Sequence, residues 1–351
     1  MTTWGCEVEM FYALFDRLQL LLIDPMVDKL VGVFDLNGRF SVVFLAISYL
    51  AALGLYLQRK REGAPGTASY WTFIGGRDVL FHPSALLDYQ YYLLRGVLKV
   101  LFVLPVVGLV EPHIWESRDY MGFFTRVWGE RPRLGENMGL MMLYGLGLFL
   151  VADCVHYWVH RVFHCRWLWE FHKVHHSAEV LVPATASRIH VVEKVAEKLA
   201  KGLFIGAYAG GFYYLCGGSV SKYTLFGSSY LVLLFNSLAA NLRHTHIWLS
   251  FGPVIEHVIN SPAQHQIHHS NDPKHFNRNF GTNLSVWDWM FGTLYVTGWQ
   301  PEPLTFGAGR PENNRYRSLW ALIFLPFILT ISRLHVRLRL AGRRPATGPD
   351  R

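Results

Sequence analysis

Six histidines lie within one segment, DCVHYWVHRVFHCRWLWEFHKVHH, residues 153–176. On a helix, His156 and His160 are one turn apart and share a face. Three more histidines share a helix face at the end of the segment: His172, His175 and His176. Imidazoles that converge from one helix face are a common way to supply nitrogen ligands to a metal. The spacing therefore indicates metal binding.

A second histidine-rich region follows much later in the chain. It consists of NLRHTH, residues 241–246, and HQIHH, residues 265–269. A single HxxxH pair is more often a surface or core pair than a ligand pair. Three motifs in the order HxxxH, HxxHH and HxxHH are different, because burying so many imidazoles without partners would be costly. The sequence therefore predicts one metal centre assembled from distant segments.

The composition is typical of a helical membrane protein. Hydrophobic residues make up 51% of the 351 residues and charged residues only 17%. In a typical soluble protein about a quarter of all residues are charged. Basic cytoplasmic loops explain the net charge of +8. Nucleic-acid binding is not indicated, because there is no basic helix with interleaved aromatic residues. The four cysteines have no paired spacing and predict neither disulfides nor a CxxC zinc site.

Uncharged apolar runs predict the membrane-spanning helices. Residues 40–57 form a run of 18 residues that is just long enough to span a bilayer, and basic residues follow it. A shorter run covers residues 100–110. Residues 138–152 form a run that leads directly into the first histidine motif. We therefore expect that motif just above the membrane surface.

Two further apolar runs, residues 202–221 and 223–242, predict a helical hairpin that crosses the membrane and returns. Such a hairpin would bring His244 and the last HxxHH motif to the face that carries the first two motifs. The positive-inside rule places that face in the cytosol.

The two ends of the chain are less regular. Residues 1–39 mix apolar and charged positions, which is typical of an amphipathic helix on the membrane or of a core helix. Residues 318–332 are apolar but are followed by several arginines, so we expect an interfacial or re-entrant helix. Residues 345–351 are expected to form a disordered tail. The predicted organisation is an N-terminal helical region, a catalytic region and a C-terminal helix with a basic tail, over residues 1–137, 138–300 and 301–351.

The histidine motifs resemble those of the fatty acid hydroxylase/sterol desaturase superfamily. The similarity lies in DCVHYWVHR, residues 153–161, in FHKVHHS, residues 171–177, and in NRNFGTNLSVWDWMFGT, residues 277–293. It covers about residues 138–296. Acyl-CoA desaturases have similar motifs but a longer gap between the first two, so they match less well.

The resemblance implies an all-α, multi-pass transmembrane helical bundle with a cytosolic, histidine-rich cap that holds two irons. It also implies O2-dependent hydroxylation or desaturation of a lipid of the sterol or fatty acyl type. Electrons would come from NAD(P)H through a cytochrome b5- or ferredoxin-like protein. A composition rich in Gly, Ala and Arg favours a bacterial plasma membrane over the endoplasmic reticulum. Neither the particular lipid nor the choice between hydroxylation and desaturation follows from the motifs.

The resemblance also extends the set of expected metal ligands. His190 and His244 resemble family positions outside the three motifs, and His246 is an alternative to His244. Two metals with about five nitrogens each need roughly ten imidazoles. The ten candidates are His156, His160, His172, His175, His176, His190, His244, His265, His268 and His269.

Other charged and aromatic residues near the motifs are expected to play smaller roles. Asp153 and Asp288 are candidates for orienting imidazole N–H groups, although a helix-end charge and a turn residue are equally compatible readings. Three more histidines are expected to take no part in the centre: His164, His257 and His275.

Other classes of protein fit the sequence less well. The main alternative is a haem-type or other histidine-rich membrane electron carrier. Such a carrier needs only two to four histidines, at membrane depth, and the motifs here contain more. A zinc-dependent intramembrane protease would need an HExxH motif, which is absent. A metal transporter would need polar residues within its spanning helices, and the runs between residues 202 and 242 have almost none.

Overall fold

The computed structural model describes residues 13, 16–36, 38–135, 137–225, 228–238, 240–309 and 311–341. Within this part the regular elements are helices, joined by loops, and one antiparallel hairpin of β1 (Thr224–Leu225) and β2 (Ser228–Ser229). The α-helices are α2 (Asp24–Val31), α3 (Val42–Arg61), α4 (Tyr70–Phe73), α5 (Gly76–Leu80), α6 (Pro83–Leu98), α7 (Leu104–Val110), α8 (Ser117–Trp128), α9 (Met138–Phe163), α10 (Trp169–His176), α11 (Val191–Leu215), α12 (Tyr230–Ser237), α13 (Gly252–Ile255), α14 (Pro262–His269), α15 (Val286–Met290) and α16 (Leu319–Ala341). The 3-10 and π helices are η1 (Gln19–Ile23), η2 (Gly32–Phe34), η3 (Lys99–Val103), η4 (Glu111–His113), η5 (Pro183–Ser187), η6 (Ala240–His244), η7 (Pro273–His275) and η8 (Glu312–Tyr316).

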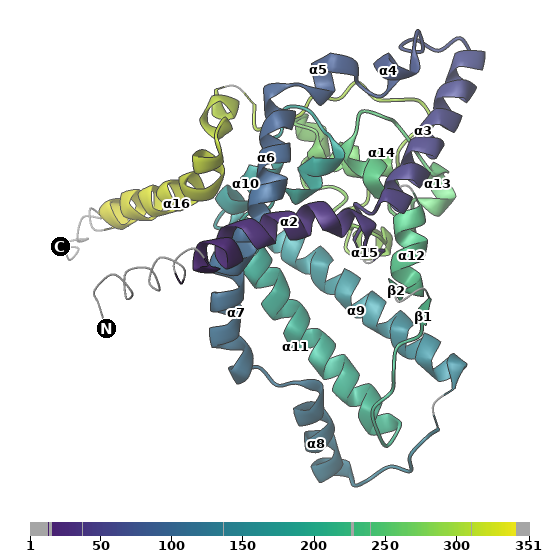
Figure 1. The fold of residues 1–351 in the computed structure, drawn as a ribbon, viewed down its shortest axis with the longest axis vertical. Coiled ribbons are helices and arrows are strands. Elements are labelled where there is room, and N and C mark those ends of the chain that lie inside the picture. Colours follow the sequence, from purple (N-terminus) through teal and green to yellow (C-terminus); the bar gives the residue numbers. More distant parts are fainter. Residues whose placement is uncertain are drawn as a thin grey trace, which may run out of the picture.

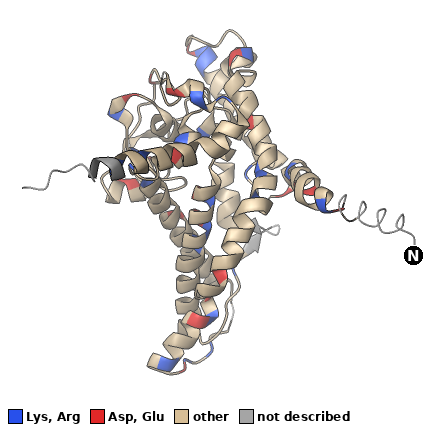
Figure 2. Cartoon of the chain, turned by 90° about the vertical axis from the view of Figure 1, so that its left-hand side faces the viewer, with Lys and Arg blue, Asp and Glu red and all other residues tan. Residues whose placement is uncertain are grey.

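Helices α7, α8, α9 and α11 form a stem below a broader region that carries the histidines (Figure 1). In the stem α11 packs against both α8 and α9. Gly210 of α11 permits the close approach of α8, because a Cβ atom there would overlap the backbone of Ser117 and the side chain of Tyr120. Figure 2 shows long uncharged stretches along the stem, with charged side chains gathered at its lower end.

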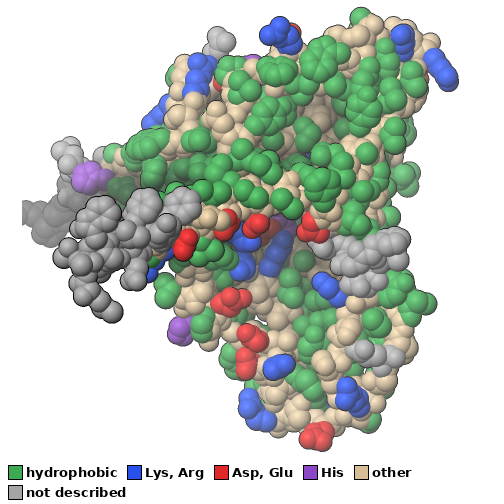
Figure 3. Space-filling view, viewed as in Figure 1, with side chains coloured by type: hydrophobic (Ala, Val, Ile, Leu, Met, Phe, Trp, Pro, Cys, Tyr) green, Lys and Arg blue, Asp and Glu red, His purple; other side chains and the backbone are tan. Residues whose placement is uncertain are grey.

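Four helical segments are long and apolar enough to cross a membrane: Val42–Arg61, Pro83–Trp128, Met138–Phe163 and Leu319–Arg337. Hydrophobic side chains also cover much of the upper part of the face seen in Figure 3. The all-α, multi-pass transmembrane fold expected from the sequence is therefore confirmed, as is the histidine-rich region that goes with it. Its location in the cytosol stays a prediction.

The predicted hairpin of residues 202–242 is wrong in its second half. Helix α11 ends at Leu215, and Gly217 then turns the chain with a φ of +67°. The segment that follows forms the β1–β2 hairpin and the eight-residue helix α12, which is too short to span a bilayer. Ser and Gly residues interrupt this apolar run in the sequence. A prediction from uncharged runs does not detect them, because they carry no charge. The chain nevertheless returns to the histidine-rich region, where η6 delivers His244.

A buried arginine ties the histidine-bearing helix α10 to its surroundings. Arg188 donates hydrogen bonds to the carbonyl of Val174 at 3.0 Å and to Ser177 Oγ at 2.9 Å, at the end of α10. It also forms a buried ion pair with Asp88 of α6 at 3.0 Å and donates to the carbonyl of Tyr316. Because all these partners are buried or backbone groups, Arg188 fixes the end of α10 relative to α6 and the C-terminal segment.

The C-terminal helix α16 is one uninterrupted helix that contains Pro326. It projects to one side of the molecule, whereas α3 lies on the opposite side (Figure 1). Its expected interfacial or re-entrant position in a membrane stays a prediction. The predicted tail, residues 345–351, and residues 1–12 of the predicted N-terminal helix lie outside the described residues.

Candidate metal centre

The two HxxHH motifs lie on two short buried helices, α10 and α14. Ser261 starts α14 through a capping box, in which its hydroxyl accepts from the Gln264 backbone and the Gln264 side chain accepts from the Ser261 backbone. Pro262 then occupies the first helical turn, where its missing N–H costs nothing. The helical spacing places each set of three histidines on the inner side of the structure, and all six are buried.

Nine histidines gather in two groups of converging ring nitrogens. Within each group the nitrogens lie within 4.8 Å of one another. The first histidine group consists of His160, His164, His172, His176 and His268. The second histidine group consists of His175, His244, His265 and His269. Each of the helices α10 and α14 supplies two histidines to one group and one histidine to the other.

The spacing of the nitrogens tests whether a metal fits. In the first group, the Nε2 atom of His172 lies 3.0 Å from that of His160 and 3.2 Å from that of His176. In the second group, His265 Nε2 lies 3.0 Å from His244 Nε2 and 3.2 Å from His269 Nε2. Two nitrogens bound at about 2.1 Å to one metal are about 3.0 Å apart at a right angle and about 3.4 Å at a tetrahedral angle.

Hydrogen bonds between the imidazoles do not explain these distances. A ring nitrogen offers one proton or one lone pair, yet the Nε2 atoms of His172 and His265 each face two other Nε2 atoms. The Nε2 atoms of His164 and His268 are buried without a hydrogen-bond partner in the described structure. A metal ion in each group would satisfy all of these lone pairs together, so the donor set fits two metals.

The protonation state also suits metal binding. Burial, reinforced by neighbouring imidazoles, lowers the pKa of His175, His176 and His269 well below its usual value. Burial also lowers the pKa of His268 to about 3. These side chains are therefore neutral near pH 7, which is the form of imidazole that binds a metal.

Hydrogen bonds at Nδ1 orient several rings of the first group. His160 Nδ1 donates to the carbonyl of Phe280 at 2.7 Å, and His268 Nδ1 donates to the carbonyl of Arg278 at 2.8 Å. His172 Nδ1 lies 2.8 Å from the carboxylate of Glu193. Each bond places the proton on Nδ1 and leaves the lone pair on Nε2, where it faces the group.

Glu193 is a functional residue that the sequence reasoning missed. It lies in the first turn of α11, four residues before Glu197, and is buried next to His172. The sequence offers only a weak signal for this role of Glu193. The first turn of any helix favours acidic residues, so a glutamate at that position does not by itself indicate a contact with a metal ligand.

In the structure, the histidine pair of α9 that joins a group begins one helical turn later than expected. His164 was expected to take no part, yet it belongs to the first group, with its ring centroid 4.7 Å from that of His172. His156 lies outside both groups, and its Nδ1 lies 2.9 Å from Glu197. Because histidines stand at positions 156, 160 and 164, spacing alone cannot tell which pair supplies the HxxxH ligands.

The structure overturns the assignment of His190 as a ligand. Its Nδ1 accepts from the backbone N–H of Val192 and caps the start of α11, and its Nε2 donates to the carbonyl of Ile323. Both ring nitrogens are therefore occupied. Of the open pair, His244 belongs to the second histidine group, whereas His246 lies outside both groups and its Nε2 accepts from the backbone N–H of Leu181.

The two aspartates do not touch the imidazoles. Asp153 accepts from the side chains of Asn283 and Trp287 and from the backbone of Leu284. Asp288 accepts from the backbone N–H groups of Phe280 and Gly281, so it holds the loop whose carbonyl orients His160. Asp153 and Asp288 thus position the segment around residues 280–288, and the expectation that they orient imidazoles directly is wrong.

The other two histidines that were expected to take no part lie outside both groups. His257 contacts the carbonyl of Pro253 through its Nδ1. His275 is buried against Tyr295, with its Nε2 3.4 Å from Glu302.

Cavities reach the histidines from two sides. A cavity of 670 Å³ is lined by histidines of both groups, among them His176 and His269, and by Trp169 and Phe276. A smaller cavity of 190 Å³ reaches His160, His172 and the second group from the side of Arg39 and Arg95. Small molecules thus have room to approach both groups.

Comparisons with known proteins agree with this geometry. The sequence pattern of the fatty acid hydroxylase family matches residues 145–293, which contain both histidine groups. Alkylglycerol monooxygenase from Danio rerio is 32% identical over 50% of this chain and 35% of its own length. The ornithine lipid hydroxylase of Rhizobium tropici is 30% identical over 43% of this chain and 41% of its own length.

A sterol desaturase matches over a longer stretch. The delta(7)-sterol 5(6)-desaturase of Schizosaccharomyces pombe is 24% identical over 73% of this chain and 68% of its own length. The chain spans only about a third of the length of the alkylglycerol monooxygenases that it matches. No solved structure matches the chain. Residues 145–293 are therefore similar to the fatty acid hydroxylase family, and the matched relatives include lipid hydroxylases and a sterol desaturase.

Proposed function

We propose that this protein is a membrane-bound di-iron oxygenase that hydroxylates or desaturates a lipid. The observation that carries the proposal is the pair of histidine groups, whose nitrogens converge at separations that fit metal coordination. The relatives named monooxygenase, hydroxylase and desaturase are all oxidoreductases that act on lipids. Four apolar helices place such an enzyme in a membrane, where its substrates are dissolved.

Iron bound in these groups would supply the O2-dependent oxidising power needed to break an unactivated C–H bond. The protein's own residues hold the ligands in place and bury most of them. All nine histidines except His164 are buried, and Phe280 packs against His160, His164 and His268. Glu193 and the carbonyls of Phe280 and Arg278 fix three rings of the first group.

The larger cavity, which touches both histidine groups, is the proposed approach for the carbon atom that is oxidised. Its volume of 670 Å³ lies within the range of about 300–1,000 Å³ that is usual for small-molecule sites. Trp169 and Phe276 give part of its wall an apolar character. These features support a lipid chain as the substrate.

A haem-type electron carrier is not favoured. An electron carrier of this type holds its haem between two axial histidines on opposite sides of the macrocycle. Here four or five imidazoles converge in each group, with neighbouring Nε2 atoms 3.0 to 3.4 Å apart, so a macrocycle would collide with the remaining rings.

The proposal also covers the side of the membrane on which the histidine groups lie and the source of electrons. Arg59, Lys60 and Arg61 in the last turn of α3 favour a cytosolic location for that helix end. We propose that the histidine groups face the cytosol of a bacterial cell. There an NAD(P)H-linked, cytochrome b5- or ferredoxin-like protein would supply electrons.

The proposal is tested by comparing lipid extracts from host cells that express the wild type or His268→Ala. A lipid that gains one oxygen, or loses two hydrogens, only with the wild type is the expected result. Cells must be grown with ample iron, because imidazole sites bind zinc more tightly than ferrous iron. A wild-type protein that binds no iron under these conditions would contradict the proposal.

A further inference from the structure

A third cavity, which shares no lining residue with the 670 Å³ cavity, is lined by many basic side chains. It has a volume of 310 Å³ and lies between α2, the junction of α6 with η3, and the first turns of α11. Six cationic side chains line it, together with a single carboxylate, Glu197. The cationic residues are Lys29, Arg95, Lys99, Lys194, Lys198 and Lys201. In the space-filling view, basic side chains gather in the hollow below α2 (Figure 3).

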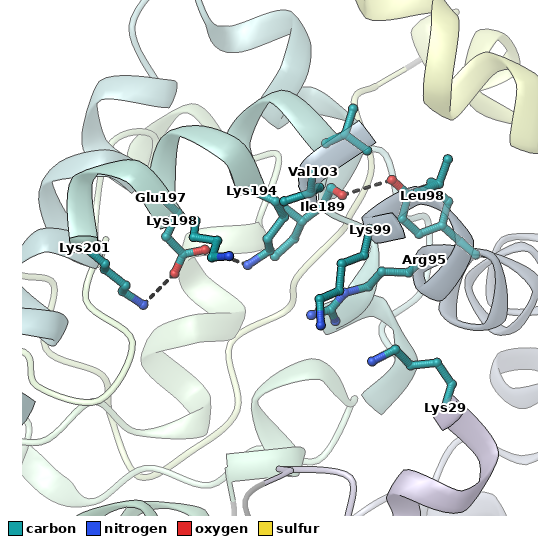
Figure 4. A pocket seen from close by; sticks show the side chains of 12 residues that line it. Lys29, Arg95, Leu98, Lys99, Val103, Ile189, Lys194, Glu197, Lys198 and Lys201 are labelled. Carbon is teal, nitrogen blue, oxygen red and sulfur yellow. Dashed lines mark hydrogen bonds and ion pairs between the residues drawn. The ribbon is translucent and has the colours of Figure 1, made fainter. Parts of the chain in front are cut away.

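The single carboxylate does not balance these charges. Glu197 is already shared by Lys194 at 2.6 Å, Lys201 at 2.7 Å and His156 at 2.9 Å. Figure 4 shows the ends of Lys29, Lys99 and Arg95 gathered on the other side of the cavity, away from Glu197. Among the described residues, no ion pair involves these three cations.

Gathering like charges in a partly enclosed space is unfavourable unless an anion joins them. Burial and the proximity of Arg95 and Lys99 lower the pKa of Lys29, although Asp28 acts in the opposite direction. Among the described residues, the Arg95 side chain donates only to the neutral hydroxyl of Ser187, at 3.3 Å. The cluster is therefore complementary to a compact, strongly charged anion such as a phosphate.

The lining of the cavity also includes apolar side chains. Leu98, Val103 and Val191 are among them. Beyond Lys99 the chain continues into exposed apolar side chains, with Leu101, Phe102 and Leu104 each about 40% exposed. An anion bound here would thus sit at the end of an apolar surface on a helix that is long enough to span a membrane. This combination suits an amphiphile, because a soluble phosphate would gain nothing from the apolar side chains.

We propose that this basic cavity binds the phosphate headgroup of an anionic membrane lipid. Basic pockets between membrane helices commonly bind such headgroups. The cavity shares Arg95, Ile189 and Lys194 with the small cavity that reaches the histidine groups. A bound lipid would therefore lie beside one approach to the metal centre. The inference goes beyond the proposed function and does not require turnover.

The test measures lipid binding to the purified full chain by native mass spectrometry. The probes are phosphatidylglycerol, phosphatidylcholine and diacylglycerol with identical acyl chains, and inorganic phosphate as a competitor. The variant Lys29→Gln/Lys99→Gln/Lys198→Gln removes three cations while keeping similar side-chain lengths. Lys222→Gln is the matched control, because Lys222 is exposed and does not line the cavity.

We expect the wild type and the control to retain phosphatidylglycerol in preference to the other two lipids. The triple variant should bind it on the order of 100-fold more weakly, from roughly fivefold per lysine. Lys198→Arg keeps the charge and should bind as the wild type does. Equal retention of all three lipids, or unchanged binding by the triple variant, would overturn the proposal. Displacement by submillimolar inorganic phosphate would overturn its lipid part.

Metal content, measured on the same samples, separates this proposal from the proposed function. All three variants should hold as much metal as the wild type, because no changed residue belongs to a histidine group. Equal metal content also shows that the triple variant is folded. Loss of lipid binding with full metal content supports the proposal, and a metal-free wild type that still selects phosphatidylglycerol counts only against the proposed function.

Discussion

The two histidine groups are built from the same parts but are supported differently. The first group takes His172 and His176 from α10 and His268 from α14, and the second takes His265 and His269 from α14 and His175 from α10. In the first group, three Nδ1 atoms hydrogen-bond to a carboxylate or a carbonyl. In the second group, the Nδ1 atoms of His175, His244 and His265 are buried without a partner in the described structure.

This difference shows that two sites built from the same HxxHH motif need not bind a metal equally tightly. A hydrogen bond at Nδ1 fixes the tautomer and the ring orientation and makes the imidazole a stronger ligand. The first group has such bonds and also has one more histidine. We therefore expect the first site to hold its metal more tightly, and the second site to lose its metal first when a chelator is added.

The largest effect is expected from removing a ligand of the first group. His268→Ala deletes a ring that contacts both His160 and His176. Activity and the metal of the first group should be lost, while the protein stays in the membrane. Metal analysis and activity assays check this, with His257→Ala as the control because His257 lies outside both groups. Full activity of His268→Ala would refute the ligand assignment.

A comparison of His164→Ala with His156→Ala tests where the first motif begins. His164→Ala should lose metal and activity, because its unpartnered Nε2 faces the first group. His156→Ala should keep both metals, because His156 contacts Glu197 and belongs to neither group. The reverse pattern in metal analysis would restore the pair at positions 156 and 160 as the ligands.

A smaller effect is expected from the carboxylate that supports the first group. Glu193→Gln leaves every ligand in place but removes the charge beside His172 Nδ1. Loss of such a partner typically weakens metal binding about 10–100-fold. Competition with a chelator should show this weakening at the first site, with the second unchanged. Equal weakening of both sites would mean that Glu193 acts on the fold as a whole.

The smallest effect is expected at His190. His190→Ala removes the cap of α11, which should lower the free energy of unfolding by about 1 kcal/mol. Both metals should stay bound, because neither ring nitrogen of His190 is available to a metal. Thermal unfolding together with metal analysis checks this, and a missing metal would return His190 to the set of ligands.

Much of the metal centre could be predicted from the sequence because helical spacing determines which side chains share a face. The structure brings the histidines at residues 172–176 and 265–269 and His244 together in two groups, and their role as metal ligands stays a prediction. Local spacing could not choose among His156, His160 and His164, since any adjacent pair has the same separation. Which pair faces the other helices depends on packing between distant segments.

The errors at His190 and in the predicted hairpin have a similar cause. A histidine before a helix can cap that helix as well as bind a metal, and only its contact with the distant Ile323 distinguishes the two roles. In residues 223–242 the absence of charged residues predicted a spanning helix, although Ser228 and Ser229 form strand β2 there. The predicted all-α membrane fold did not depend on either detail, because it rested on long uncharged runs such as that of α9.

The central claim is that the two histidine groups are two separate metal sites. The most direct test is the iron content of the wild type, His176→Ala and His269→Ala, purified without oxygen from iron-rich cultures. Each variant changes one group only, so each should hold half the iron of the wild type, and the double variant should hold none. If either single variant lost all the iron, or if both kept the full amount, the claim of two sites would be contradicted.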